Sequence, residues 1–310
     1  MISIKKILVP VDFSEPSMQA VNYGLSLALQ FNAHLVLAHI VPSSTALIYT
    51  FPTQSFGFEK DQVNYARSVL PTLVPEKSRD RVALQTIVRT GEVRSDLLEI
   101  VNNEKIDLVV MGTHGRNAFE RFLLGSLTGR MLRKFNVPVL TVSHLDPSKE
   151  LHSTDPVPLR HVLYATDLSD SAEIGLRFSI ELARGTGARL TVLHVFDDLQ
   201  TVHWDAEGGG YYPEALQGLR DDALARLRNS IPEELCSDVL VTPVMVEGEA
   251  FREILRFAEE DKADLIVMNL QGKSRIESAL LGSTAERVIR AAHIPVLSIP
   301  VTVEQRMRAA

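Results

Sequence analysis

The chain has 310 residues, of which 45% are hydrophobic and 23% are charged, values typical of globular proteins rather than of disordered ones. Its net charge of −7 disfavours a duplex nucleic-acid partner, because such partners normally meet a basic surface. A single cysteine, Cys236, excludes an intramolecular disulfide and fits a reducing compartment, so we expect a cytoplasmic protein without nucleic-acid or membrane partners.

The N-terminal region carries two features that bear on membrane targeting. The apolar stretch after Lys6 is interrupted by Asp12 and is too short for a signal peptide. No Asp, Glu, Lys or Arg stands between Glu15 and Glu59, but polar side chains and prolines interrupt this stretch and disfavour a membrane hairpin. We expect a helix, a buried strand and an uncharged loop there.

The first half of the chain is predicted to alternate strands with helices. The apolar run "KKILVPVD" (residues 5–12) predicts a strand, and Ser14 predicts the N-cap of the next helix, with Pro16 in its first turn. A second strand, "AHLVLAHIV", is followed by a segment expected to be irregular and by a third strand near "VALQTIVRTG".

The next elements complete an α/β pattern. A helix is predicted from apolar residues at i, i+4, i+7 and i+8, which are Val93, Leu97, Ile100 and Val101. "IDLVVMG" predicts a fourth strand, a last helix begins near Ser126, and "VPVLTV" predicts a fifth strand. Nearly continuous Val, Ile and Leu strands between helices indicate a parallel sheet covered on both faces.

The chain contains this pattern twice. Residues 5–41 align without a gap with residues 160–196, and residues 91–142 align with residues 248–299. The offset changes from 155 to 157 positions between the two blocks, so a net two residues were inserted in the middle. We predict two tandem open five-stranded parallel-sheet domains, Rossmann-like in class, at 1–143 and 159–310, joined by a polar linker at 144–158.

The carboxyl edge of each predicted sheet carries groups suited to a nucleotide. Asp12 ends the first strand and Gly112 ends the fourth, and ligands of open parallel sheets bind at this edge. Carboxylates accept hydrogen bonds from ribose hydroxyls, and glycines let backbone N–H groups approach phosphate. Gly115 and Ser126, at a helix start, extend the anion site. A tight turn at Gly112 and a cap at Asp12 remain the structural alternatives.

The spacing of these residues resembles a known family. Gly112, two residues, Gly115, nine residues and then Gly125-Ser126 are similar to the G-2x-G-9x-G-[S/T] signature of the universal stress protein family. The segments "ILVPVDFS" and "LAHIV" resemble the first two strand regions of that family. The resemblance covers both halves and implies the adenine nucleotide alpha hydrolase-like fold, with binding of ATP or AMP and Mg²⁺ possible with ATP.

The resemblance also implies roles for individual residues. In the first copy Asp12 holds the ribose or sits beside the adenine, and Val11 and Ile40 line the base pocket. Arg116 either adds charge at the phosphates or is a solvated loop residue. The residues expected around the phosphates are Gly112, Gly115, Gly125, Ser126 and Thr128.

The second copy departs from the signature at one position. Asn269 stands where the first copy has Gly112, and its side chain is expected where phosphates would approach. The other matching positions are Thr166, Asp167, Val195, Gly272, Gly282 and Ser283. Nucleotide binding by the second copy is therefore an open question at this point.

Two further features are noted. His39 and His194 occupy the same place in both copies, where a hydrogen-bonded histidine at a strand end is favoured over a catalytic or metal-binding one. Trp204 and "EGGGYYP" form a glycine-rich loop that is a lid, a partner contact or a plain connection. No cluster with metal-ligand spacing is found in the sequence.

Three functions compete on these grounds. The first is a stress-response regulatory protein that binds adenine nucleotide and hydrolyses it slowly at most, since no general base is evident. The second is an enzyme that transfers adenylyl or phosphoryl groups, and the third is a scaffold in which only the first copy binds nucleotide. The family further implies a pseudo-dimer of the two copies through their fifth strands, and a homodimer or a regulatory protein partner is possible.

Overall fold

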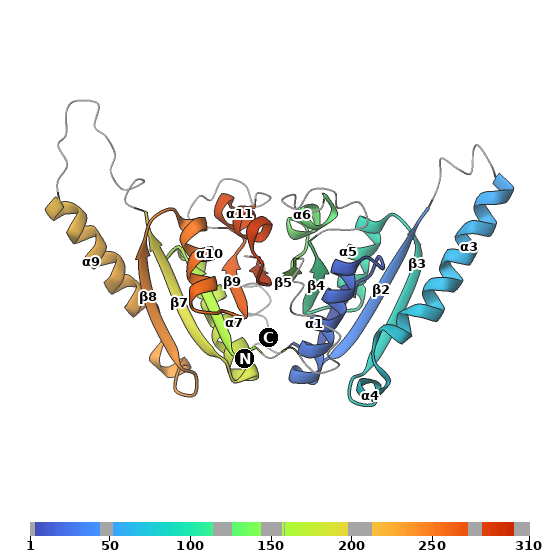
Figure 1. Ribbon diagram of the computed structural model, residues 1–310, viewed down its shortest axis with the longest axis horizontal. Helices are drawn as coiled ribbons and strands as arrows, with labels where there is room; N and C mark the ends of the chain where they lie inside the picture. The colour runs from blue at the N-terminus through green and yellow to red at the C-terminus, as the bar shows by residue number, and fades with distance from the viewer. Residues whose placement is uncertain are drawn as a thin grey trace, which may run out of the picture. The chain divides into compact units, whose positions relative to one another are not determined.

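The computed structural model describes residues 4–43, 52–113, 126–143, 157, 159–197, 213–271 and 281–300. The chain divides into two compact units, Ile2–Pro158 and Leu159–Ala310, which hold the two sequence repeats and are called the first and second copy below. Figure 1 shows that each copy combines a sheet with flanking helices. The α/β class predicted from the sequence is confirmed.

The first copy contains five strands and the helices between them. Its elements are β1 (Lys6–Pro10), α1 (Glu15–Phe31), β2 (His34–Pro42), α3 (Pro52–Val69), η1 (Leu70–Leu73), α4 (Glu76–Arg79), β3 (Leu84–Gly91), α5 (Val93–Asn103), β4 (Leu108–Gly112), α6 (Ser126–Leu132) and β5 (Val139–Val142). The strands lie in the order β3-β2-β1-β4-β5, and all four neighbouring pairs are parallel.

The second copy repeats this arrangement. Its elements are β6 (His161–Thr166), α7 (Ala172–Thr186), β7 (Arg189–Phe196), α9 (Pro213–Asn229), η2 (Glu233–Leu235), β8 (Val241–Glu247), α10 (Ala250–Glu260), β9 (Leu265–Asn269), α11 (Ser283–Ala291) and β10 (Val296–Ile299). The order is β8-β7-β6-β9-β10, again with parallel pairs throughout.

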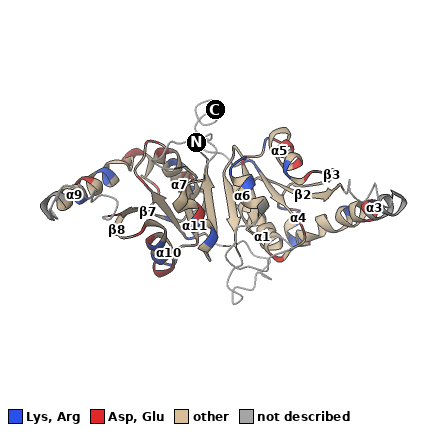
Figure 2. Ribbon diagram, turned by 90° about the horizontal axis from the view of Figure 1, so that it is seen from above, with Lys and Arg blue, Asp and Glu red and all other residues tan. Residues whose placement is uncertain are grey.

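Both faces of each sheet are covered. Connections between parallel strands are right-handed. Helices in connections that run toward opposite edges of the sheet therefore lie on opposite faces. Figure 2 shows α1 and α5 on opposite sides of the first sheet, and α7 and α10 on opposite sides of the second. The central strands are buried, and Ile7, Leu8 and Val9 of β1 are fully inaccessible to solvent, whereas the edge strands β3 and β8 are partly exposed.

The start of α1 follows the sequence prediction. Ser14 is the N-cap, its side chain accepts a hydrogen bond from the N–H of Ser17, and a proline stands in the first turn. Within this helix the hydroxyl of Ser26, which is buried, donates to the carbonyl oxygen of Val157 at 3.0 Å.

The segment between β2 and β3 was expected to be irregular, and this prediction is wrong. It contains α3 and the short helices η1 and α4. Within residues 59–69 of α3, Ala66 is the one buried side chain, so the helix buries too narrow an apolar stripe to produce a helical repeat in the sequence.

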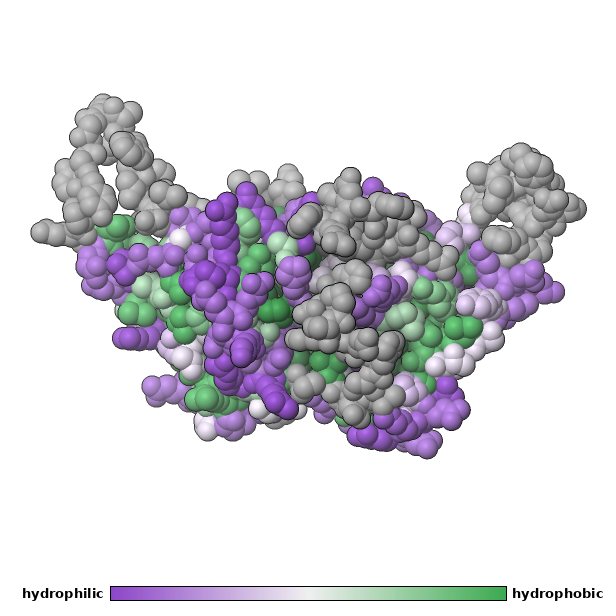
Figure 3. Space-filling view, viewed as in Figure 1, coloured by the Kyte–Doolittle hydropathy of each residue, from purple (hydrophilic) through white to green (hydrophobic). Residues whose placement is uncertain are grey.

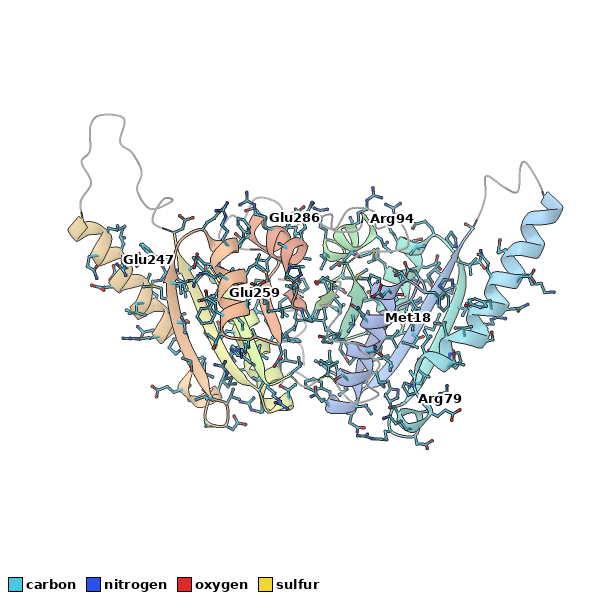
Figure 4. The ribbon with its side chains drawn as sticks, in the orientation of Figure 1. Met18, Arg79, Arg94, Glu247, Glu259 and Glu286 are labelled. Carbon is cyan, nitrogen blue, oxygen red and sulfur yellow. The ribbon has the colours of Figure 1, made fainter. Side chains whose placement is uncertain are left out.

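Charged side chains form contacts at α9 and at the start of α5. Arg220 of α9 pairs with Glu247 at the end of β8, which Figure 4 places beside that helix. Arg94, labelled in the same figure at the start of α5, donates to Glu92 at 2.8 Å. Arg94 and the N–H of Ser95 together lower the pKa of Glu92 to about 2, so this N-cap carboxylate is ionised at any ordinary pH.

α10 shows the amphipathic pattern of a surface helix. Ile254 and Ala258 are buried, while Arg256 forms ion pairs with Glu253 and Glu260 at 2.6 Å along the outer face. Figure 3 shows hydrophilic side chains gathered over this helix. Such exposed pairs contribute little to stability, so α10 is held by its apolar stripe.

Candidate functional site

The predicted nucleotide residues meet where the strand order reverses. β1 pairs with β2 on one side and with β4 on the other, with Leu8 opposite Val109. Asp12 follows the end of β1, and Gly112 ends the adjacent β4, so both lie at the carboxyl edge of neighbouring strands. The second copy brings Asp167 and Asn269 to the same edge through the pairing of β6 with β9. This reversal is where open parallel sheets form ligand crevices.

Asp12 shapes the loop that leads into α1. Its Oδ1 accepts hydrogen bonds from the backbone N–H of Ser14 at 3.0 Å and from the Ser14 hydroxyl at 2.5 Å. Phe13 between them has a φ of 62°, a left-handed conformation that this turn fixes. Asp12 thus fixes the turn before α1, whereas the N-cap of the helix is Ser14, so Asp12 is not itself the cap considered in the sequence.

The corresponding loop of the second copy has the same construction. Asp167 Oδ1 accepts from the N–H of Ser169 at 3.0 Å, and Leu168 has a φ of 57°. Thr166 also takes part, because its hydroxyl oxygen accepts from the N–H of Leu168 at 3.1 Å. Both copies thus present an acidic residue on a turn of fixed geometry.

The positions expected to line the base pocket lie beside these loops. The N–H of Val11 donates to the carbonyl oxygen of Ala38 at 2.8 Å, which joins the end of β1 to β2. Val11 and Ile40 are 3% and 7% exposed, so they offer mainly backbone groups at the edge. Val195 holds the equivalent place on β7 and is half-buried.

The paired histidines have a structural role. Nδ1 of His39 lies 2.7 Å from the carbonyl oxygen of Val11, and Nδ1 of His194 lies 2.9 Å from that of Thr166. Each ring ties the second strand of its copy to the end of the first. This agrees with the hydrogen-bonded histidine favoured from the sequence.

Gly112 is constrained by packing as well as by any ligand. A Cβ at this position would lie 2.8 Å from the Cβ of Pro16 and 2.9 Å from its carbonyl carbon. The first turn of α1 therefore rests directly on the end of β4. Packing against Pro16 is thus a structural reason for the glycine that the sequence associates with phosphate.

Thr128 reaches the site through Gly112. Its hydroxyl donates to the carbonyl oxygen of Gly112 at 2.9 Å, and the side chain is 4% exposed. The bond fixes the start of α6 against the end of β4. In the second copy Ala285 stands at this position, so the tie is particular to the first copy.

Replacing Thr128 by valine is expected to lower the free energy of unfolding of the first copy by about 1 kcal/mol, because the Gly112 carbonyl loses its donor while the side-chain shape is kept. Urea denaturation measures the change. Thr128→Ser retains the hydroxyl and should stay closer to the parent protein. Equal stability of the valine variant and the parent would show that this bond contributes nothing.

In the second copy the start of α11 is held by its own backbone. The N–H of Gly282, the N-cap residue, donates to the carbonyl oxygen of Leu270 at 2.8 Å. A Cβ at Gly282 would lie 3.2 Å from that oxygen, so glycine allows this close approach. Ser283 then begins α11, as predicted, and its side chain is exposed.

Part of the predicted cradle lies outside the described residues. This holds for Gly115, Arg116, Gly125 and Gly272, and for the loop with Trp204. Ser126 begins α6 at the predicted helix start.

The sequence did not indicate a side-chain difference between the two edges. In the first copy the rings of Phe13 and His39 lie 4.8 Å apart, and Tyr65 of α3 stacks edge-on against Phe13 at 5.6 Å. In the second copy Arg226 of α9 donates to the carbonyl oxygen of Leu168 at 2.8 Å. These contacts depend on α3 and α9, and the segment that holds α3 had been expected to be irregular.

The described residues also bear on metal sites and on membrane-spanning helices. Within the described ranges, no group of three or more His, Cys, Asp and Glu side chains is arranged to hold a metal ion. In the same ranges, no helix has the length and apolar character needed to cross a membrane.

Comparison with known proteins gives a consistent result. The family model described as "Universal stress protein family" matches residues 3–143 and 158–300. A universal stress protein of Methanocaldococcus jannaschii is 36% identical over 141 residues, covering 45% of this chain and 81% of its own. One of Mycobacterium tuberculosis H37Rv is 27% identical over 306 residues, covering 94% of this chain and 95% of its own. The crystal structure of a universal stress protein from Archaeoglobus fulgidus has a TM-score of 0.66 at 20% identity, covering 96% of this chain and 98% of that one, which supports the fold.

Proposed function

The chain belongs to the universal stress protein family, and on that premise we propose that it is a regulatory protein that binds ATP or AMP. In the proposed arrangement the ribose lies at Asp12 and the base lies against the backbone of Val11 and Ile40. The phosphates lie between Gly112 and the start of α6, where the signature residues of the following loop complete the cradle. Mg²⁺ accompanies the nucleotide when it is ATP.

The observation that carries the proposal is the meeting of Asp12 and Gly112 at the strand-order reversal. An acid there accepts ribose hydroxyls, and a helix that begins just beyond the next strand offers backbone N–H groups and a positive dipole end to an anion. The turn at Asp12 and the close packing of Gly112 against Pro16 support the proposal, because they hold the backbone at both positions in place.

We expect hydrolysis to be slow at most. A general base must reach the attacking water. His39 and His194, which occupy the same position in the two copies, use Nδ1 in hydrogen bonds with carbonyl oxygens at the strand ends. Phosphoryl or adenylyl transfer would need a further reactive group at the edge. Long incubation with ATP followed by product analysis separates binding from such transfer.

Mass spectrometry of small molecules released from the purified protein tests the proposal directly. Recovery of an adenine nucleotide, or saturable binding of ATP with Mg²⁺ by calorimetry, is the expected result. A protein that releases no nucleotide and shows no heat of binding with ATP or AMP contradicts the proposal.

Asp12→Asn is expected to weaken nucleotide binding by the first copy about tenfold, because a charge-assisted bond to the ribose becomes a neutral one. The amide keeps an oxygen that can accept from the N–H of Ser14, so the turn before α1 is retained. Calorimetry gives the affinity and circular dichroism checks the fold. Unchanged affinity in a folded variant would remove Asp12 from the site.

A further inference from the structure

The second copy replaces the glycine at the end of the fourth strand by Asn269, and the structure shows where that side chain goes. Its Nδ2 donates to the carbonyl oxygen of Ser171 at 2.5 Å, at the N-cap of α7. Its Oδ1 lies 3.3 Å from the hydroxyl of Tyr164, which donates to the carbonyl oxygen of Ala172 at 2.6 Å. The amide is therefore bonded to the first turn of α7.

Room for this amide is made by a glycine on α7. A Cβ at Gly175 would lie 1.9 Å from Oδ1 of Asn269 and 2.7 Å from the hydroxyl oxygen of Tyr164. An alanine at this position would overlap the amide. Glycine within a helix is otherwise unfavourable, so the space needed by the Asn269 amide explains why position 175 is a glycine.

The first copy holds the complementary set of residues. By the repeat alignment, Ala20 corresponds to Gly175 and Gly112 corresponds to Asn269. The strand residue changes as well, from Val9 to Tyr164. The second copy therefore has a smaller residue on α7 and larger residues on β6 and β9 than the first copy has at the matching positions. These differences compensate in volume, so the two copies are packed differently.

The direction of the Asn269 side chain decides its relation to the predicted anion site. The amide lies on the face of the sheet that α7 covers. The predicted anion site lies at the start of α11, the helix that connects β9 to β10. This connection runs toward the β10 edge of the sheet, whereas the connection through α7 runs toward the β8 edge. The two helices therefore lie on opposite faces (Figure 2). The start of α11 is held by the bond from Gly282 to Leu270.

We propose that Asn269 is a positioning residue that fixes β9 to α7, and that it leaves the carboxyl edge of the second copy available to a second nucleotide. The inference rests on the proposed function and extends it, since the chain then holds two nucleotides. Burial of Tyr164 keeps its pKa well above the usual value, so its hydroxyl stays a donor to this cluster. Asp167 takes the ribose in the second copy as Asp12 does in the first.

Counting nucleotides on the full chain tests the inference. Equilibrium dialysis with labelled ATP and Mg²⁺ is expected to give two per chain, with Asp12→Asn and Asp167→Asn each weakening one of them about tenfold. A single nucleotide that is weakened by Asp12→Asn and not by Asp167→Asn overturns the inference and leaves the proposed function standing. Absence of binding overturns both.

Asn269→Gly distinguishes a positioning residue from an obstacle. We expect a lower melting temperature for the second copy, because the Ser171 carbonyl loses a hydrogen bond and a cavity forms. Affinity at the second site should stay within about twofold, below the tenfold effect of losing a charged contact. A gain in affinity of about tenfold or more would show that Asn269 obstructs the ligand, because relief of a steric clash changes affinity by about this factor.

Transplanting the cluster into the first copy supplies the matched control. Gly112→Asn alone is expected to destabilise the first copy strongly, because the new Cβ meets Pro16 and the amide, placed as in Asn269, would overlap Ala20, the counterpart of Gly175. Adding Ala20→Gly should recover part of the loss, beyond the sum of the two single effects in a double-mutant cycle. Strict additivity would contradict the claim that space on the helix admits the asparagine.

Discussion

Gly112→Ala is expected to destabilise the first copy by about 1–3 kcal/mol, the usual cost of inserting a methyl group into a fully packed site. The new Cβ would lie 2.8 Å from the Cβ of Pro16 and 2.9 Å from its carbonyl carbon, and neither atom belongs to a flexible side chain. The first turn of α1 would have to move away from β4. Differential scanning calorimetry should show an earlier transition for the first copy.

Gly218→Ala is the matched control for this variant. Gly218 lies within α9, is exposed, and a Cβ there would meet no atom within 4 Å. Alanine in such a helix position should stabilise the protein by about 0.5–1 kcal/mol. If Gly112→Ala left stability unchanged while Gly218→Ala raised it, the contact with Pro16 would not constrain this site, and phosphate binding would remain the sole reason for the glycine.

Below pH 6.5 the second copy is expected to lose stability as the pH falls, with a slope of at most about 1.4 kcal/mol per pH unit, the limit for one proton. The cause is His161, which is 3% exposed. Its Nε2 lies 2.9 Å from the hydroxyl of Thr191 and 3.5 Å from Asp261, and its Nδ1 lies 3.1 Å from Arg189. Burial first, and then the charge of Arg189, lower the pKa of His161 below its ordinary value of 6.5.

The sign of this dependence follows from proton counting. Because the pKa is lower in the folded chain, the unfolded chain binds more protons than the folded chain as the pH falls below 6.5. The contribution of the neutral His161 ring to the free energy of unfolding is therefore fully present above pH 6.5 and declines as the pH falls below this value. In the first copy Lys6 takes this position and pairs with Glu104 at 3.0 Å, so no such decline is expected there.

His161→Gln isolates the effect, because the other histidines are common to both proteins and cancel. Urea midpoints at pH 7.5, 6.5 and 5.5 should separate the two proteins progressively less as the pH falls, since only the parent loses the contribution. Parallel pH profiles would mean that His161 does not titrate in this range.

The strands and their edge were predictable from the sequence, because buried parallel strands give continuous apolar runs and the duplication repeats them. The cap at Ser14 was predictable for the same local reason. The helix α3 was not, since Ala66 alone among residues 59–69 is buried and no apolar period results. Contacts between elements, such as the packing of Pro16 against Gly112, could not be predicted from local sequence patterns either.

Asn269 shows most clearly what sequence cannot supply. A side chain in place of a signature glycine suggests obstruction, and only the position of α7 shows which way the amide turns. The glycine that admits it lies 94 positions earlier in the chain, at Gly175. Nothing in the local pattern of either residue connects the two.

The exchange at these two positions constrains how the copies diverged after the duplication. A chain with alanine on the helix and asparagine on the strand would overlap two side chains, whereas glycine at both leaves only a small gap. We therefore expect divergence in either direction to have passed through the double-glycine state, which constrains the order of substitutions. Sister sequences that retain glycine at both positions would be survivors of that intermediate.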